Sequence, residues 1–84
     1  MNTIFLLMAE FETADIPLER IAEKYLGIDG NQAKRQAAVQ RLPIPCYRAG
    51  TQKSPWLVRV TDLAEFLDKQ RAAAKKDWTA MNAA

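Results

Sequence analysis

The chain has 84 residues, which is enough for one small domain and too few for two. It contains no histidine and one cysteine, which excludes Ser-His-Asp triads, histidine-ligated metals, internal disulfides and cysteine-rich zinc sites. The net charge of +2 is unevenly distributed: residues 1–30 carry −4, residues 31–59 carry +6 with no acid at all, and residues 60–84 are neutral. This cationic middle third predicts a polyanionic partner.

The same composition argues against an enzyme. The three glycines form no phosphate-binding pattern, and the acidic pairs lie on an expected helix surface, where charged residues usually face water. We therefore expect no catalytic residues, no metal and no cofactor. The apolar run at residues 4–9 is too short to span a membrane, and the single cysteine favours a reducing, cytoplasmic location.

The first expected element is a helix over residues 3–11, capped by Thr3. Ile4, Leu7, Met8 and Phe11 form one stripe, and the opposite side is also apolar. A helix that is apolar nearly all round is buried on several faces, either in the fold or against a second copy. A strand is the alternative for so short a segment.

A second helix is predicted over residues 17–26. Pro17 suits a first helical turn, where its missing N–H costs nothing. Gly27 then suits the left-handed conformation that follows a helix. Between them the apolar residues follow an amphipathic helical pattern, namely Leu18, Ile21, Ala22, Tyr25 and Leu26.

A third helix is predicted over residues 31–41, with Asn31 as its N-cap. One side carries small residues that allow close packing: Ala33, Ala37 and Ala38. The other side carries Gln32, Arg35, Gln36 and Val39, which together can contact phosphates, base edges and thymine methyl groups. Taken alone, this side also fits an ordinary solvated helix face.

Residues 45–60 predict a β-hairpin. Leu42-Pro43-Ile44-Pro45 ends the preceding helix, and two segments rich in aromatic and β-branched residues flank a polar loop whose tip carries Gln52 and Lys53. Cys46 is expected to pack as a small hydrophobe rather than to react.

A last helix is predicted over residues 62–78, capped by Thr61. Its apolar spacing continues from Ala74 to Trp78 and Met81, with little chain left to cover it. This end is interpreted either as a self-association surface or as a frayed tail. The expected division is a domain over residues 1–76 and a helical extension or tail over residues 77–84.

The order helix, glycine turn, helix, proline stop, hairpin, helix is that of a winged helix-turn-helix, a mainly helical α+β fold. In this architecture the second helix of the pair enters the major groove, and the hairpin, or wing, reaches adjacent DNA. The second helix and the wing are the elements that carry the unopposed positive charge.

Several segments resemble a known family. Residues 16–27, 42–45 and 60–67 resemble the excisionase/MerR-type winged helix, and the first eight residues and the wing at residues 48–55 more narrowly resemble the pyocin activator (PrtN) family. The resemblance implies a small transcriptional activator that binds DNA upstream of phage-tail-like bacteriocin genes. Gln40 stands where excisionase-type proteins commonly have glycine before Leu-Pro, which suggests that the third helix runs longer here.

The resulting hypothesis is a DNA-binding activator that binds double-stranded DNA in the cytoplasm, at the nucleoid. We expect a homo-oligomer formed through the apolar N- and C-terminal segments, and we consider contact with RNA polymerase. An excisionase that bends DNA and a phage-encoded protein-interaction adaptor or inhibitor are the alternatives. The candidate DNA-binding residues are Asn31, Gln32, Lys34, Arg35, Gln36, Arg48, Gln52, Lys53 and Ser54.

Overall fold

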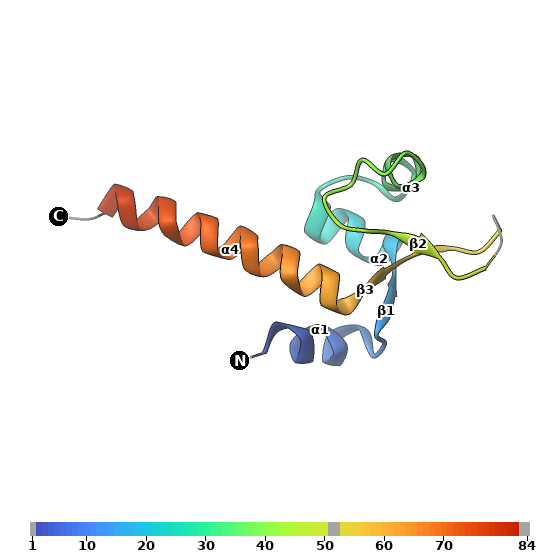
Figure 1. Cartoon of the computed structure of the whole chain (residues 1–84), viewed down its shortest axis with the longest axis horizontal. Helices are drawn as coiled ribbons and strands as arrows, with labels where there is room; N and C mark the ends of the chain where they lie inside the picture. Colours follow the sequence, from blue (N-terminus) through green and yellow to red (C-terminus); the bar gives the residue numbers. More distant parts are fainter. Residues whose placement is uncertain (1, 51–52, 83–84) are drawn as a thin grey trace.

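The computed structural model describes residues 2–50 and 53–82. In chain order its elements are α1 (Thr3–Phe11), β1 (Asp15–Pro17), α2 (Leu18–Ile21), the π-helical turn η1 (Ala22–Leu26), α3 (Gly30–Ala38), β2 (Tyr47–Arg48), β3 (Trp56–Arg59) and α4 (Val60–Asn82). Helix α1 lies on one side of the junction between the sheet and α4, and α2 and α3 lie on the other (Figure 1). The prediction of a mainly helical α+β fold is confirmed.

The three strands form one antiparallel sheet in the order β1-β3-β2. The predicted hairpin corresponds to β2 and β3, whereas β1 is a correction, because Asp15 to Pro17 were expected to lead into a helix. Ile16 pairs with Val58, and both side chains are fully buried. Pro17, which has no N–H to donate, closes this edge strand, and the helix begins only at Leu18.

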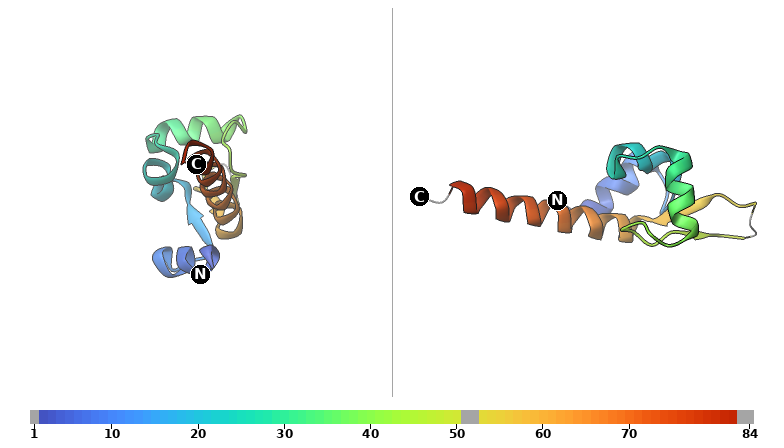
Figure 2. Two further views of the ribbon diagram at one scale, coloured as in Figure 1. Left: turned by 90° about the vertical axis from the view of Figure 1, so that its left-hand side faces the viewer. Right: turned by 90° about the horizontal axis from the view of Figure 1, so that it is seen from above.

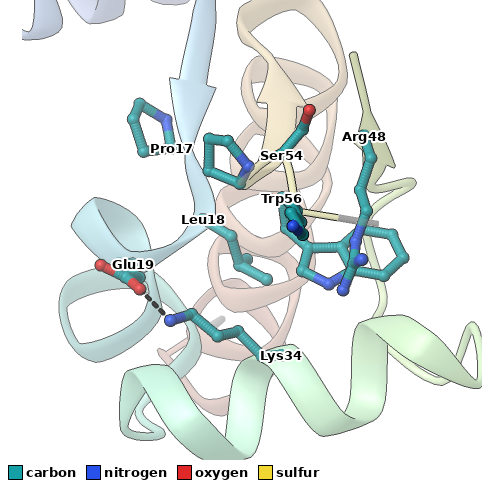
Figure 3. A pocket seen from close by; sticks show the side chains of 9 residues that line it. Pro17, Leu18, Glu19, Lys34, Arg48, Ser54 and Trp56 are labelled. Atoms are coloured by element: carbon teal, nitrogen blue, oxygen red, sulfur yellow. Dashed lines mark ion pairs between the residues drawn. The ribbon is translucent and has the colours of Figure 1, made fainter. Parts of the chain in front are cut away.

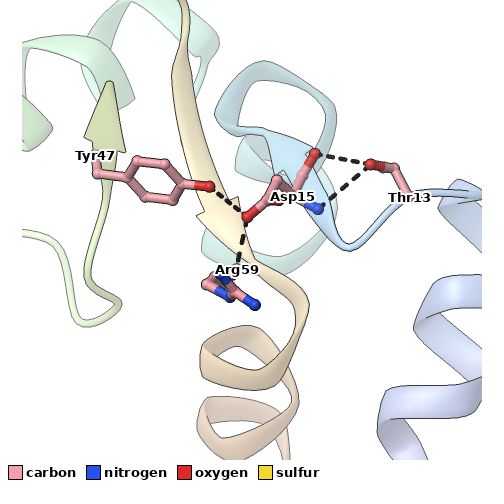
Figure 4. Close-up of polar contacts among 4 residues, drawn as sticks. All are labelled: Thr13, Asp15, Tyr47 and Arg59. Atoms are coloured by element: carbon pink, nitrogen blue, oxygen red, sulfur yellow. Dashed lines mark hydrogen bonds and ion pairs between the residues drawn. The ribbon is translucent and has the colours of Figure 1, made fainter. Parts of the chain in front are cut away.

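A polar cluster joins the three strands at the base of the hairpin (Figure 4). The Tyr47 hydroxyl of β2 donates a hydrogen bond to the Asp15 carboxylate of β1. The Arg59 Nε atom of β3 lies 4.0 Å from the same carboxylate oxygen. Thr13 receives a 3.3 Å hydrogen bond from the Asp15 backbone N–H. One aspartate therefore links the edge strand β1 to both strands of the hairpin.

The core lies where α1, α2, α3, the sheet and the start of α4 meet. Its largest fully buried side chains come from β1, α2, β3 and α4, namely Ile16, Leu18, Ile21, Val58 and Leu63. Of the stripe predicted on α1, Leu7 and Phe11 are buried and Ile4 is half-buried, while Met8 is 44% exposed. Phe5 on the other side is 70% exposed, so residues 2–50 and 53–82 do not cover all of this apolar helix.

The helix boundaries agree with the sequence in outline, but three predicted caps are wrong. Asn2 rather than Thr3 caps α1, by accepting a 2.9 Å hydrogen bond from the Ile4 N–H. Asp29 rather than Asn31 caps α3, by accepting a 2.8 Å hydrogen bond from the Gln32 N–H. Thr61 lies inside α4, which begins at Val60 directly after β3. The N-caps of α1 and α3 and the start of α4 therefore lie one or two residues earlier than predicted. In α1 and α3 a polar residue that precedes the predicted cap, Asn2 or Asp29, is the N-cap.

Two left-handed residues frame the pair of helices. Gly27, with φ of 71°, follows η1 as predicted. Gln40, with φ of 56°, follows α3, which ends at Ala38 and not at residue 41. The expectation that Gln40 would lengthen this helix is therefore wrong, because Gln40 adopts the conformation that glycine favours.

Helix α4 is longer than predicted and continues to Asn82. Its first turns supply Val60, Leu63 and Ala64 to the core, whereas every residue from 68 to 82 is exposed. Figure 2 shows this half of α4 extending beyond the body of the protein. No helix within residues 2–50 and 53–82 is both long and apolar enough to cross a membrane.

Candidate nucleic-acid interface

Helix α3 turns its small residues inward and its polar residues outward. Ala33 and Ala37 are fully buried, as predicted, while Asn31 and Arg35 are exposed. Ala38, which was expected on the inner side, is exposed, because it lies 100° further round the helix than Ala37, at the end of α3. The close approach of the two alanines fixes α3 against the core and leaves Arg35 pointing away from it.

A cleft of about 360 Å³ lies between α2, α3 and the β2–β3 hairpin (Figure 3). Its cationic side chains are Lys34 from α3 and Arg48 and Lys53 from the hairpin. Leu18, Pro17 and Pro55 provide apolar walls. Ser54 also lines the cleft, so the fold brings together four of the nine predicted residues, although 14 or more positions separate Lys34 from the others.

Two interactions hold the cationic side chains of the cleft in place. Lys34 forms an ion pair with Glu19 of α2, and both side chains remain about half exposed. The Arg48 guanidinium lies 4.6 Å from the centre of the Trp56 ring, a cation–π contact across the hairpin. Arg48 is thereby held in an extended orientation along the sheet, while Lys34 reaches from α3 toward α2 (Figure 3).

The other predicted residues lie outside this cleft. Asn31 and Arg35 are on the exposed face of α3, and Gln32 and Gln36 are half-buried on its flank. Gln52 lies outside the residues that the structure describes. The candidate interface thus has two parts: the outer face of α3 and the cationic cleft beside it.

Sequence reasoning missed the two residues that hold Lys34 and Arg48 in place. Glu19 comes from the acidic first third, 15 positions before Lys34, and only the packing of α2 against α3 brings the two together. Trp56 was predicted as part of a strand but not as the ring beneath Arg48. The cross-strand register gives the signal that could have found it, because Arg48 pairs directly with Trp56.

The local charge of the interface is lower than the sequence count. Of the six cations in residues 31–59, Lys34 has Glu19 beside it and Arg59 has Asp15 beside it. Within the described part of the chain no group of acidic or cysteine side chains is suited to hold a metal ion.

Comparison with known proteins assigns a family to this arrangement. A family model described as pyocin activator protein PrtN matches residues 3–74. This match includes α1, all of the cleft and the half of α4 that packs on the core. Neither the curated proteins nor the solved structures gave a significant match. Because the model covers well over half of the 84 residues, the chain belongs to the pyocin activator protein PrtN family, whose membership implies a transcriptional activator of pyocin genes and not an enzyme.

Proposed function

We propose that the protein activates pyocin-type genes by binding double-stranded DNA at their promoters, with α3 in the major groove and the β2–β3 hairpin as a wing on the adjacent backbone. The observation that carries the proposal is the convergence of Lys34 from α3 with Arg48 and Lys53 from the hairpin on one cleft. Cations from a helix and a neighbouring hairpin on one face match the path of phosphates along a groove.

The two parts of the interface would have different tasks. Arg35 on the outer face of α3 can donate two hydrogen bonds to guanine, and Gln32 and Gln36 can pair with adenine. Asn31 would reach the groove from the first turn of the same helix. Phosphate contacts, which fix the register without reading sequence, would fall to Lys34 and to the wing residues Arg48, Gln52, Lys53 and Ser54.

A single small module covers only about 600–1,000 Å² of DNA. We therefore expect two or more copies on repeated sites. An activator of this kind acts at the nucleoid in the bacterial cytoplasm, and contact with RNA polymerase is part of the proposal.

The test is DNA binding by a double variant, Arg35→Ala with Lys53→Ala, measured by fluorescence anisotropy on promoter fragments from upstream of pyocin genes. The variant should lose most of its affinity, because it removes one groove contact and one phosphate contact. Arg35→Ala alone should also relax discrimination between promoter and random DNA, whereas Lys53→Ala should weaken both equally.

The matched control is Lys69→Ala with Lys76→Ala, which removes the same charge from exposed positions on α4. It should retain nearly wild-type affinity. Equal affinities of the Arg35/Lys53 variant and the wild-type protein would show that the interface is elsewhere.

A further inference from the structure

The second half of α4 is exposed along its length, and Asp68 at its start accepts a hydrogen bond from the Thr3 hydroxyl of α1. We call residues 68–82 the overhang; all of them are exposed, and they form a helix about 22 Å long. The molecule consequently measures 55 Å along its longest axis and 26 and 16 Å along the others. Figures 1 and 2 show the overhang leaving the body on the side away from the hairpin.

One face of the overhang is the continuation of the face that α4 buries. Ala64 is 2% exposed and Leu67 packs partly against the core. The same face continues at spacings of three and four through Arg71 and Ala74 to Trp78 and Met81. Trp78 is 66% exposed and Met81 is 86% exposed. Two large apolar side chains in neighbouring turns therefore stand in water.

The body carries an apolar surface next to this face. A groove of about 300 Å³ runs between α1 and α4, and Leu6, Leu67 and Arg71 are among its lining residues. Leu6 is 46% exposed, and Phe5 beside it is 70% exposed. One chain thus has both an apolar projection and an apolar groove, but the projection points away from its own groove.

The charges along α4 favour an antiparallel partner of the same sequence. Residues 60–68 contain three acids, Asp62, Glu65 and Asp68, and no cation. Residues 69–82 contain Asp77 and four cations, Lys69, Arg71, Lys75 and Lys76. Antiparallel alignment of two copies about Ala74 places Arg71 of each copy level with Asp77 of the other, whereas parallel alignment in register would place cations against cations.

We propose that two copies of the chain associate through an antiparallel pairing of their overhangs, with Ala74 of each copy at the two-fold axis. In this register Trp78 of each copy lies opposite Arg71 of the other, and Met81 reaches the groove between α1 and α4. The small Ala74 side chain lets the helices approach closely, and Arg71 supplies a cation for the face of the indole ring.

The size of this surface sets the strength of association. Two tryptophans bury roughly 300–500 Å² together, and paired helices about 22 Å long complete an interface near the lower end of the range for specific complexes. The dimer is therefore of moderate affinity, and it forms without DNA. It places the two cationic clefts at opposite ends of the paired helices.

Sedimentation equilibrium of the full chain without DNA tests the proposal. The mass should rise with concentration from 9.5 kDa toward twice that value. Trp78→Ala should weaken association about tenfold or more, as truncation of a central interface tryptophan commonly does. Lys76→Ala lies 200° away around the helix and should leave association unchanged. A monomer at every concentration, or a dimer insensitive to Trp78→Ala, would overturn the proposal.

Cysteine cross-linking tests the orientation. Ala74→Cys should give a disulfide-linked dimer under mild oxidation, and Ala73→Cys, one position off the face, should not. Met81→Cys distinguishes the two alignments, because an antiparallel pair holds these positions about 21 Å apart and a parallel pair brings them together. Efficient cross-linking through Met81→Cys would contradict the antiparallel dimer. Since these measurements contain no DNA, their failure is separate from failure of the proposed function.

Discussion

The ion pair between Lys34 and Glu19 predicts that a carboxylate of the protein competes with DNA for a cation of the interface. Lys34 lines the cleft and at the same time forms an ion pair with Glu19 of α2. Each additional phosphate contact makes the slope of log K against log salt more negative by about 0.9, which multiplies the loss of affinity between 50 and 200 mM salt by about 3.5. Glu19→Gln releases Lys34 and should add about one phosphate contact.

The expected result for Glu19→Gln is tighter binding and a steeper salt dependence. The slope of log K against log salt should become more negative by about 0.9, and the loss of affinity between 50 and 200 mM should be about 3.5 times that of the wild-type protein. The affinity at low salt should rise by only a few fold, because an exposed ion pair is worth at most about 1 kcal/mol. Fluorescence anisotropy over a series of salt concentrations measures both quantities.

Glu65→Gln is the matched control, since it makes the same charge change and removes the partner of Lys69 on α4. Its slope should equal that of the wild-type protein. If Glu19→Gln and Glu65→Gln give the same slope, Glu19 does not compete with phosphate for Lys34.

Three further predictions concern stability and the cysteine. Gln40→Gly should raise the melting temperature by several degrees, since it relieves about 1 kcal/mol of left-handed strain at φ of 56°, while Ala38→Gly at the end of the same helix should lower it. Gly27→Ala should lower the free energy of unfolding, measured in urea, by about 1 kcal/mol, because alanine is strained at a φ of 71°. An added Cβ would meet no atom within 4 Å, so no steric clash adds to this cost. Burial raises the pKa of the Cys46 thiol to about 11, so alkylation of Cys46 at pH 8 should be far slower in the folded protein than in the unfolded chain. Because the pKa is higher in the folded state, the free energy of unfolding should be unaffected by this thiol below its unfolded pKa and should fall as the pH rises toward 11. Equal alkylation rates in the two states would contradict this burial.

Local patterns predicted the helices and the hairpin because their signals lie within a few residues. The bounds predicted for α1 agree with the structure, and Gly27 has the predicted left-handed conformation. Strand β1 left no such signal. It has three residues, and it is a strand because Ile16 pairs with Val58, 42 positions later, where both side chains become fully buried. Pairing over such a separation is a property of the fold rather than of the local sequence.

In the candidate site, too, the features with a local sequence signal could be predicted and those that depend on long-range packing could not. The cations of α3 and the hairpin could be identified from the absence of acids in residues 31–59, and the fold places Lys34, Arg48 and Lys53 on one cleft. The carboxylates that approach this region could not be identified, because Glu19 and Asp15 belong to the acidic first third. Segment charges therefore predicted which surface is cationic but overestimated its strength.

The end of α3 shows how burial outweighs local preference. Glutamine is a good helix former, so continuing α3 through Gln40 is locally favourable, and a left-handed glutamine costs about 1 kcal/mol. However, Ile44 is 2% exposed in the core and lies between two prolines that cannot continue a helix. Burying an isoleucine is worth roughly 1.5–3 kcal/mol, which exceeds the cost at Gln40. The chain therefore turns at Gln40, and α3 ends early enough for Ile44 to reach the core and for the hairpin to return beside Lys34.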